Sequence, residues 1–94
     1  MEKIRKSRKY LRVTVDMDSS GFVMPKQITW DDGRIYKIDG IRDFHPANSR
    51  IGTSDIDCYF VLIQGQERCL YFERLDEAFA GRYGRWYVEV QKSQ

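Results

Sequence analysis

The feature that most constrains the fold is the alternation of apolar and polar side chains over residues 10–17. The apolar positions of this segment are Leu11, Val13, Val15 and Met17. A period of two places alternate side chains on opposite faces of a strand, whereas an amphipathic helix repeats every 3.6 residues. The segment therefore predicts a strand that buries one face.

Turn residues divide the next part of the chain into further strands. Residues 22–30 predict a second strand, in which Pro25 marks a start, an edge or a bulge because proline has no amide to donate. Asp31-Asp32-Gly33 predicts a hairpin turn. The return strand is expected over residues 34–43, with a bulge or bend at Gly40 where the alternation slips. Residues 45–54 predict a loop.

A second predicted hairpin is apolar on both faces. Residues 56–63 and 68–73 flank a short turn, and a type II′ turn at Gly65-Gln66 would pair residue 63 with residue 68. One face then carries Tyr59, Val61, Ile63, Leu70 and Phe72, and the other carries Cys58, Phe60, Leu62, Cys69 and Tyr71. Strands of this kind are covered on both sides or wrapped into a barrel.

The last third of the chain predicts one or two helical turns and one more strand. Leu75, Ala78 and Phe79 have helical spacing, and Gly81 is placed to end a helix. Residues 86–90 alternate again, with Trp86 on the inward face. The fold class predicted from these elements is mainly β: a small antiparallel six-stranded barrel (SH3-like or similar) with at most one short helix.

The length of 94 residues predicts one domain. We expect a flexible basic N-terminal arm over residues 1–9, a single β-barrel domain over 10–91 and a tail over 92–94. The first twelve residues hold six basic side chains and one acidic side chain, which suits either phosphate contact or solubility. The chain contains neither an apolar run of membrane-spanning length nor a signal-peptide pattern, so we expect a cytoplasmic protein that does not enter a membrane.

Residue chemistry argues against catalysis. Cys58 and Cys69 lie in apolar strand segments, where burial suppresses thiol reactivity, and the predicted register separates them by about 13 Å along the strand. His45 is the only histidine, and Asp55 and Asp57 are interpreted as solvated carboxylates at a loop edge. We therefore expect no enzyme activity, no catalytic residue, no metal site and no cofactor.

Two classes of binding function remain open. A protein partner is the first, because Trp, Tyr and Arg serve as interface anchors and a small barrel offers a groove or an edge strand. Single-stranded nucleic acid is the alternative, because arginines alternate with aromatic residues along the chain. Binding sites concentrate on loops, so the candidate residues are the loop residues His45 and Arg50 and those able to approach them. The full set is Arg34, Tyr36, Arg42, His45, Arg50 and Arg85.

Several spaced motifs resemble a known family. They are Trp30-x-Asp32-Gly33-Arg34-x-Tyr36-x-Ile38-Asp39, Pro46-Ala47-x-Ser49-Arg50-x-Gly52 and Gly84-Arg85-Trp86-Tyr87-Val88-Glu89. Together they are similar to a family of small uncharacterised β-rich proteins of Gram-positive bacteria, over about two thirds of the chain. The resemblance implies a short β-rich protein without an established activity. Because some members are encoded near DNA-damage-tolerance genes, it also implies a link of the nucleic-acid alternative to DNA metabolism.

Overall fold

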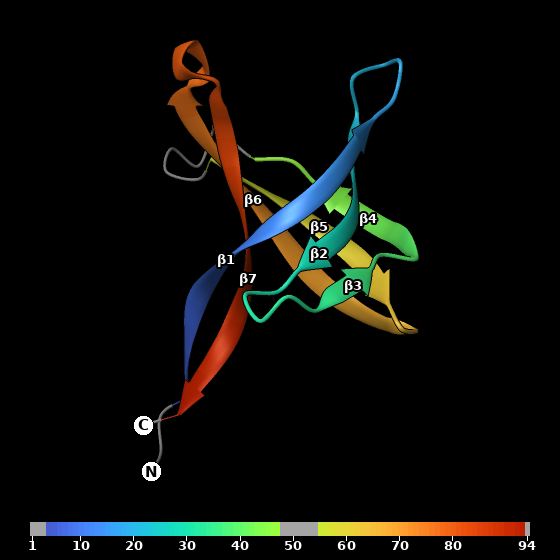
Figure 1. Cartoon of the computed structure of the whole chain (residues 1–94), viewed down its shortest axis with the longest axis vertical. Helices are drawn as coiled ribbons and strands as arrows, with labels where there is room; N and C mark the ends of the chain where they lie inside the picture. Colours follow the sequence, from blue (N-terminus) through green and yellow to red (C-terminus); the bar gives the residue numbers. More distant parts are fainter. Residues whose placement is uncertain (1–3, 48–54, 94) are drawn as a thin grey trace.

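The computed structural model describes residues 4–47 and 55–93, which form one curled antiparallel sheet in the shape of a half-barrel (Figure 1). The strand order is β3-β2-β1-β7-β6-β5-β4. The only helical element in the described part is the 3-10 turn η2 (Ala78–Ala80). The strands are β1 (Ile4–Met17), β2 (Val23–Thr29), β3 (Ile35–Lys37), β4 (Gly40–His45), β5 (Ile56–Ile63), β6 (Gln66–Glu77) and β7 (Arg82–Ser93).

The first strand is longer than its alternation predicted. β1 begins at Ile4 and pairs with β7 from Ile4↔Ser93 to Leu11↔Trp86. Residues 4–9, predicted as part of a flexible basic arm, therefore lie in the sheet, and residues 92 and 93 of the predicted tail lie in β7. The reason for the difference is long-range pairing, which supplies backbone partners that a local pattern does not reveal.

Pro25 lies at a bulge in the β1–β2 hairpin. The pairing register shifts between Thr14 and Val15, and Val15 is the residue opposite Pro25. The proline ring is fully buried. Of the three roles that the sequence left open for Pro25, the bulge is the observed one, because a ladder can skip a missing donor where its register shifts.

The predicted return strand over residues 34–43 is divided into β3 and β4. The interruption lies at Ile38 and Asp39, just before the expected bend at Gly40, and a second irregularity separates Ile41 from Asp43. The amide of Ile38 donates to the Lys26 carbonyl (2.9 Å), and the amide of Asp39 donates to the Leu62 carbonyl (2.7 Å). Consecutive residues therefore bond to β2 and to β5. This division is why the structure has seven strands rather than six.

The β5–β6 hairpin has the predicted faces but a different register. Ile63 pairs with Gln66, not with residue 68. The predicted type II′ turn at Gly65-Gln66 is wrong, because the loop residues are Gln64 and Gly65, both with positive φ (53° and 77°). This is the type I′ pattern. A shift of two residues preserves the faces, since side chains alternate with the same period.

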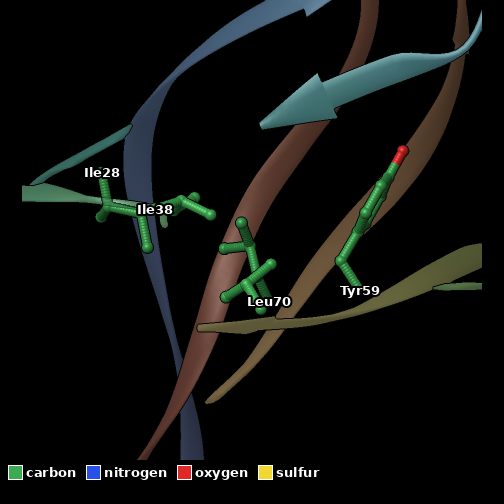
Figure 2. Packing of buried hydrophobic residues seen from close by; sticks show 5 residues of the cluster. Ile28, Ile38, Tyr59 and Leu70 are labelled. Carbon is green, nitrogen blue, oxygen red and sulfur yellow. The ribbon is translucent and has the colours of Figure 1, made fainter. Parts of the chain in front are cut away.

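The core lies on the concave side of the sheet (Figure 2). Its buried members are Ile28, Ile38, Tyr59, Val61 and Leu70. The Tyr59 hydroxyl donates to the Val23 carbonyl (3.0 Å), which gives this buried polar atom its hydrogen-bond partner. Burial raises the pKa of Tyr59 to about 12, with a smaller contribution from the Asp57 charge.

Among the described residues, no helix has the length and apolar character needed to cross a lipid bilayer.

Candidate binding site

The residues predicted as a binding site lie on separate parts of the sheet. Arg34 forms an ion pair with Asp32 (3.3 Å) just before β3, and Tyr36 lies within β3. Arg42 and His45 are exposed on β4, at the other end of the strand order, and His45 bonds to Asp43 (2.9 Å). Arg85 lies on the central strand β7. Arg50 is outside the described residues.

A cavity of about 490 Å³ opens where β6 and β7 part. The pairing between these strands reaches Tyr71↔Tyr87 and goes no further in the described residues. Beyond that pair, β7 continues beside β1, whereas β6 continues beside β5. Figure 1 shows the resulting separation between the β1–β7 ribbon and the β5–β6 hairpin. We call the opening between these two pairs of strands the slot.

The slot has apolar walls and a polar rim. The apolar wall residues are Ile28, Trp30, Tyr36, Val61, Ile63, Leu70, Val88 and Val90. Polar side chains lie around them, among which are Lys6, Gln64, Arg68, Glu89 and Gln91. A pocket of a few hundred Å³ with mostly apolar walls and a few polar groups is the usual form of a ligand site.

Trp30 links the predicted hairpin turn to the slot. Its ring packs edge-on against the Tyr36 ring, with 6.3 Å between centroids, and both side chains line the slot. The Lys9 ammonium lies 5.5 Å from the centroid of the Trp30 ring and forms an ion pair with Asp31 in the adjoining turn. The hydrogen bond from Lys9 lowers the pKa of Asp31. A neighbouring charge pair thus lies against one of these two aromatic walls.

The convex face carries a second cluster, which includes Arg85. The Glu73 carboxylate accepts hydrogen bonds from Arg85 (2.8 Å), Arg8 (3.1 Å) and the Tyr10 hydroxyl (3.0 Å). The Arg85 guanidinium lies 4.1 Å from the centroid of the Tyr10 ring, and that of Arg8 lies 4.6 Å from the Tyr87 ring. Burial alone would raise the pKa of Glu73, but the bonds from Arg85 and Tyr10 and the arginine charges outweigh it and lower the pKa.

Tyr87 shows that the convex face buries side chains too. The alternation that places Trp86 inward predicts an outward residue 87, yet the Tyr87 side chain is only 3% exposed. The ring stacks on Tyr71 at 4.9 Å between centroids and packs against Tyr10 at 5.5 Å. Burial raises the pKa of Tyr87. Alternation identifies the face on which a side chain lies, but it carries no information about neighbours that cover it from adjacent strands.

Asp57 is a buried carboxylate that the sequence interpretation assigned to solvent. The residue is 5% exposed and accepts two hydrogen bonds from Arg74 (2.9 and 3.1 Å) and one from the Ala47 amide (2.7 Å). The bonds to Asp57 raise the pKa of Arg74. Asp57 therefore connects Ala47, in the segment after β4, with Arg74 of β6. The prediction of a solvated pair holds for Asp55, which is exposed, and is wrong for Asp57.

The tip of the β6–β7 hairpin exposes two aromatic side chains. Phe79 in η2 is 91% exposed and Tyr83 at the start of β7 is 67% exposed. Gly81 (φ 78°) ends the 3-10 turn in the left-handed conformation, as the sequence predicted for this position.

Comparisons of the chain with protein-family models, with curated proteins and with solved structures found no match.

Proposed function

We propose that this protein is a small non-catalytic binding module for protein partners, and that the slot receives apolar side chains of the partner. The observation that carries the proposal is the apolar cavity of about 490 Å³ between β6 and β7. A cavity of about 150 Å³ accommodates benzene, so the slot has room for about two or three apolar side chains. Interfaces gain most of their affinity from a few anchors buried in such pockets.

We propose further that the sheet acts as a closed six-stranded barrel, in which residues 35–45 behave as one bent strand. The bonds from Ile38 to β2 and from Asp39 to β5 support this closure. A closed barrel leaves no open edge at β3 and β4.

Single-stranded nucleic acid has less support as the partner. Arg8 and Arg85 are both paired with Glu73, and they cover the rings of Tyr87 and Tyr10. A base stacked on either ring would have to displace a guanidinium from its carboxylate, and phosphate contact would compete with the same ion pairs. The steep salt dependence of phosphate binding separates the two functions in one titration.

Selection of peptides from a random library on the immobilised protein tests the proposal. We expect the selected peptides to contain apolar side chains and to lose binding when Val90→Trp fills the slot. Val90 is half-buried, lines the slot and lies outside the main core cluster, so the substitution removes space with little effect on the core. The affinity should fall at least about tenfold, which corresponds to roughly 1.4 kcal/mol.

The matched control is Val15→Trp. Val15 is 43% exposed on β1 and does not line the slot. The control should retain wild-type affinity, and both variants should keep a cooperative thermal transition. Equal binding by wild type and Val90→Trp would refute the proposal. A failure to select any peptide, combined with salt-sensitive binding of single-stranded oligonucleotides, would favour the nucleic-acid alternative.

A further inference from the structure

We infer that the partner enters the slot as an extended strand and pairs with the free backbone edge of β7. This inference rests on the proposed function, and it adds the conformation of the partner and the backbone groups that hold it. In the described residues, β7 has no strand partner on its slot side beyond Tyr87. Unpaired edges next to apolar pockets are the standard setting for strand addition.

The register identifies which backbone groups face the slot. A two-residue turn makes Ile63 and Gln66 a hydrogen-bonded pair, so the backbone groups of every second residue from Gln66 point to β5. The backbone groups of Tyr71 therefore point to β7, where Tyr71 pairs with Tyr87. Counting in steps of two along β7, the amides and carbonyls of Glu89 and Gln91 point into the slot.

The neighbouring residues on β7 point the other way. By the same alternation, the backbone groups of Val88 and Val90 face β1, where these residues are opposite Lys9 and Ser7. Among the residues that the structure describes, Glu89 and Gln91 have no strand partner on this side, so they offer two donors and two acceptors to an incoming strand. Both residues line the slot.

The β7 edge is favoured over the facing edge of β6. At this end, the β1–β7 ribbon consists of two strands, whereas β6 is backed by β5 and then by β4. A two-stranded ribbon is only marginally stable in water, whereas three strands with an apolar face can be stable. An added strand therefore stabilises the ribbon more than it stabilises the β4–β5–β6 side.

The side chains around the slot specify the chemistry of the strand. Val88 and Val90 are on the concave face and line the slot together with Trp30 and Tyr36, so the inward residues of the strand should be apolar. Glu89 lies on the convex face and accepts a hydrogen bond from the Tyr71 hydroxyl (3.2 Å), so the outward residues should be polar, with a basic residue favoured beside Glu89. The occupant is thus an extended peptide that alternates apolar with polar side chains.

Two N-methylated versions of the tightest library-selected peptide provide the test, each methylated on alternate amides. One set of amides points to β7 and the other points away. We expect one version to lose affinity by about tenfold or more, because N-methylation removes donors and blocks close approach, and the other to bind within about twofold of the parent. Equal losses, or no loss in either version, would overturn the inference.

Amide hydrogen exchange of the protein gives the second readout. In the complex, the amides of Glu89 and Gln91 should exchange at least about tenfold more slowly than in the free protein. The amides of Val88 and Val90 serve as the control, since they already face β1. Protection of Glu67 and Cys69 alone would show that β6 is the edge used and would overturn the assignment to β7.

The two levels of the proposal fail in different ways. Val90→Trp could lose binding while the two N-methylated peptides bind alike. This result would support the slot as the site for apolar side chains and would refute strand addition. Undiminished binding in Val90→Trp refutes the proposed function itself. A free protein that sediments as a dimer, and becomes a monomer in Val90→Trp, would show that a second copy of this chain fills the slot, which also contradicts the inference.

Discussion

Replacement of Gly84 by alanine should destabilise the protein, because the ring of Phe72 occupies the space of the missing side chain. A Cβ atom at this position would lie 2.2 and 2.6 Å from two ring carbons of Phe72 and 2.7 Å from the Glu73 carbonyl oxygen. The ring cannot withdraw freely, since it packs against Trp86 with 4.8 Å between centroids. The carbonyl belongs to the β6 ladder, so it cannot move without disturbing the sheet.

The expected loss follows from the cost of overpacking. An added methyl in a packed site costs about 1–3 kcal/mol, and the greater β propensity of alanine offsets about 0.5–1 kcal/mol of this. We therefore expect the free energy of unfolding, measured by urea denaturation, to fall by about 1–2 kcal/mol. For a domain of this size, Tm should fall by about 4–16 °C.

Gly40→Ala is the matched control. A Cβ atom at Gly40 meets no atom within 4 Å, and the residue does not have positive φ. This variant should be as stable as wild type or more stable by up to about 1 kcal/mol. Phe72→Leu should cost less in the Gly84→Ala background than in wild type, because it relieves part of the overlap. Equal stabilities of the two alanine variants would refute the assigned packing.

Three further predictions concern charged and thiol groups. Asp57→Ala should lower the free energy of unfolding, measured by urea denaturation, by about 2 kcal/mol or more. The reason is that the Ala47 amide loses its acceptor and Arg74 loses its bidentate partner. The control Asp16→Ala, at an exposed residue, should change this free energy by less than about 0.5 kcal/mol. The pKa of Glu73 is lowered in the folded state. The free energy of unfolding of wild type should therefore exceed that of Glu73→Gln by its full amount at neutral pH, and the difference should shrink as the pH falls below about 4.3. A difference that grows in acid would contradict the ion-pair cluster. Burial, with a smaller effect of Cys69, raises the pKa of Cys58 to about 11. In a Cys69→Ser variant the effect of burial remains, so alkylation of Cys58 by iodoacetamide should keep accelerating above about pH 9; a plateau near pH 9 would show an exposed thiol.

The local patterns of the sequence were sufficient for the type of fold. Alternation and turn chemistry predicted a mainly β chain, the turn at Asp31-Asp32-Gly33 and a short helical turn before Gly81. The helical turn is shorter than its spacing predicted, because Leu75 lies in β6. The β5–β6 register was wrong by two residues because both candidate turns contain Gly65, and the choice between them depends on the positive φ of Gln64. Nothing in the composition of this turn distinguishes the two registers.

The cysteines illustrate how a conclusion can hold when its reason does not. Both are free, as the predicted separation of about 13 Å along the strand required. That separation corresponds to about four residues, whereas Cys69 is opposite Phe60 and therefore two residues from Cys58. The two thiols are close enough for Cys69 to affect the pKa of Cys58. The sequence predicted that these residues share one face, and the separation along the strand depended on the register.

The candidate site was only partly accessible to sequence reasoning. Tyr36 was predicted and lines the slot beside Trp30. The slot itself results from the point at which β7 leaves β6, and this depends on pairing between residues far apart in the chain. Asp57 was missed for a similar reason, since its burial depends on Arg74 and Ala47. The arginines of the sequence suggested contacts to nucleic acid, yet the Arg85 guanidinium already forms an ion pair with Glu73.

The most direct test of the slot as the binding site is a map of amide chemical-shift changes in isotope-labelled protein titrated with a selected peptide. We expect the largest changes at slot residues on three strands, with Ile63, Leu70 and Glu89 as reporters, and little change at Phe79 on the hairpin tip. Changes centred on Phe79 and Tyr83, or on Arg42 and His45 of β4, with the slot residues unmoved, would contradict the assignment.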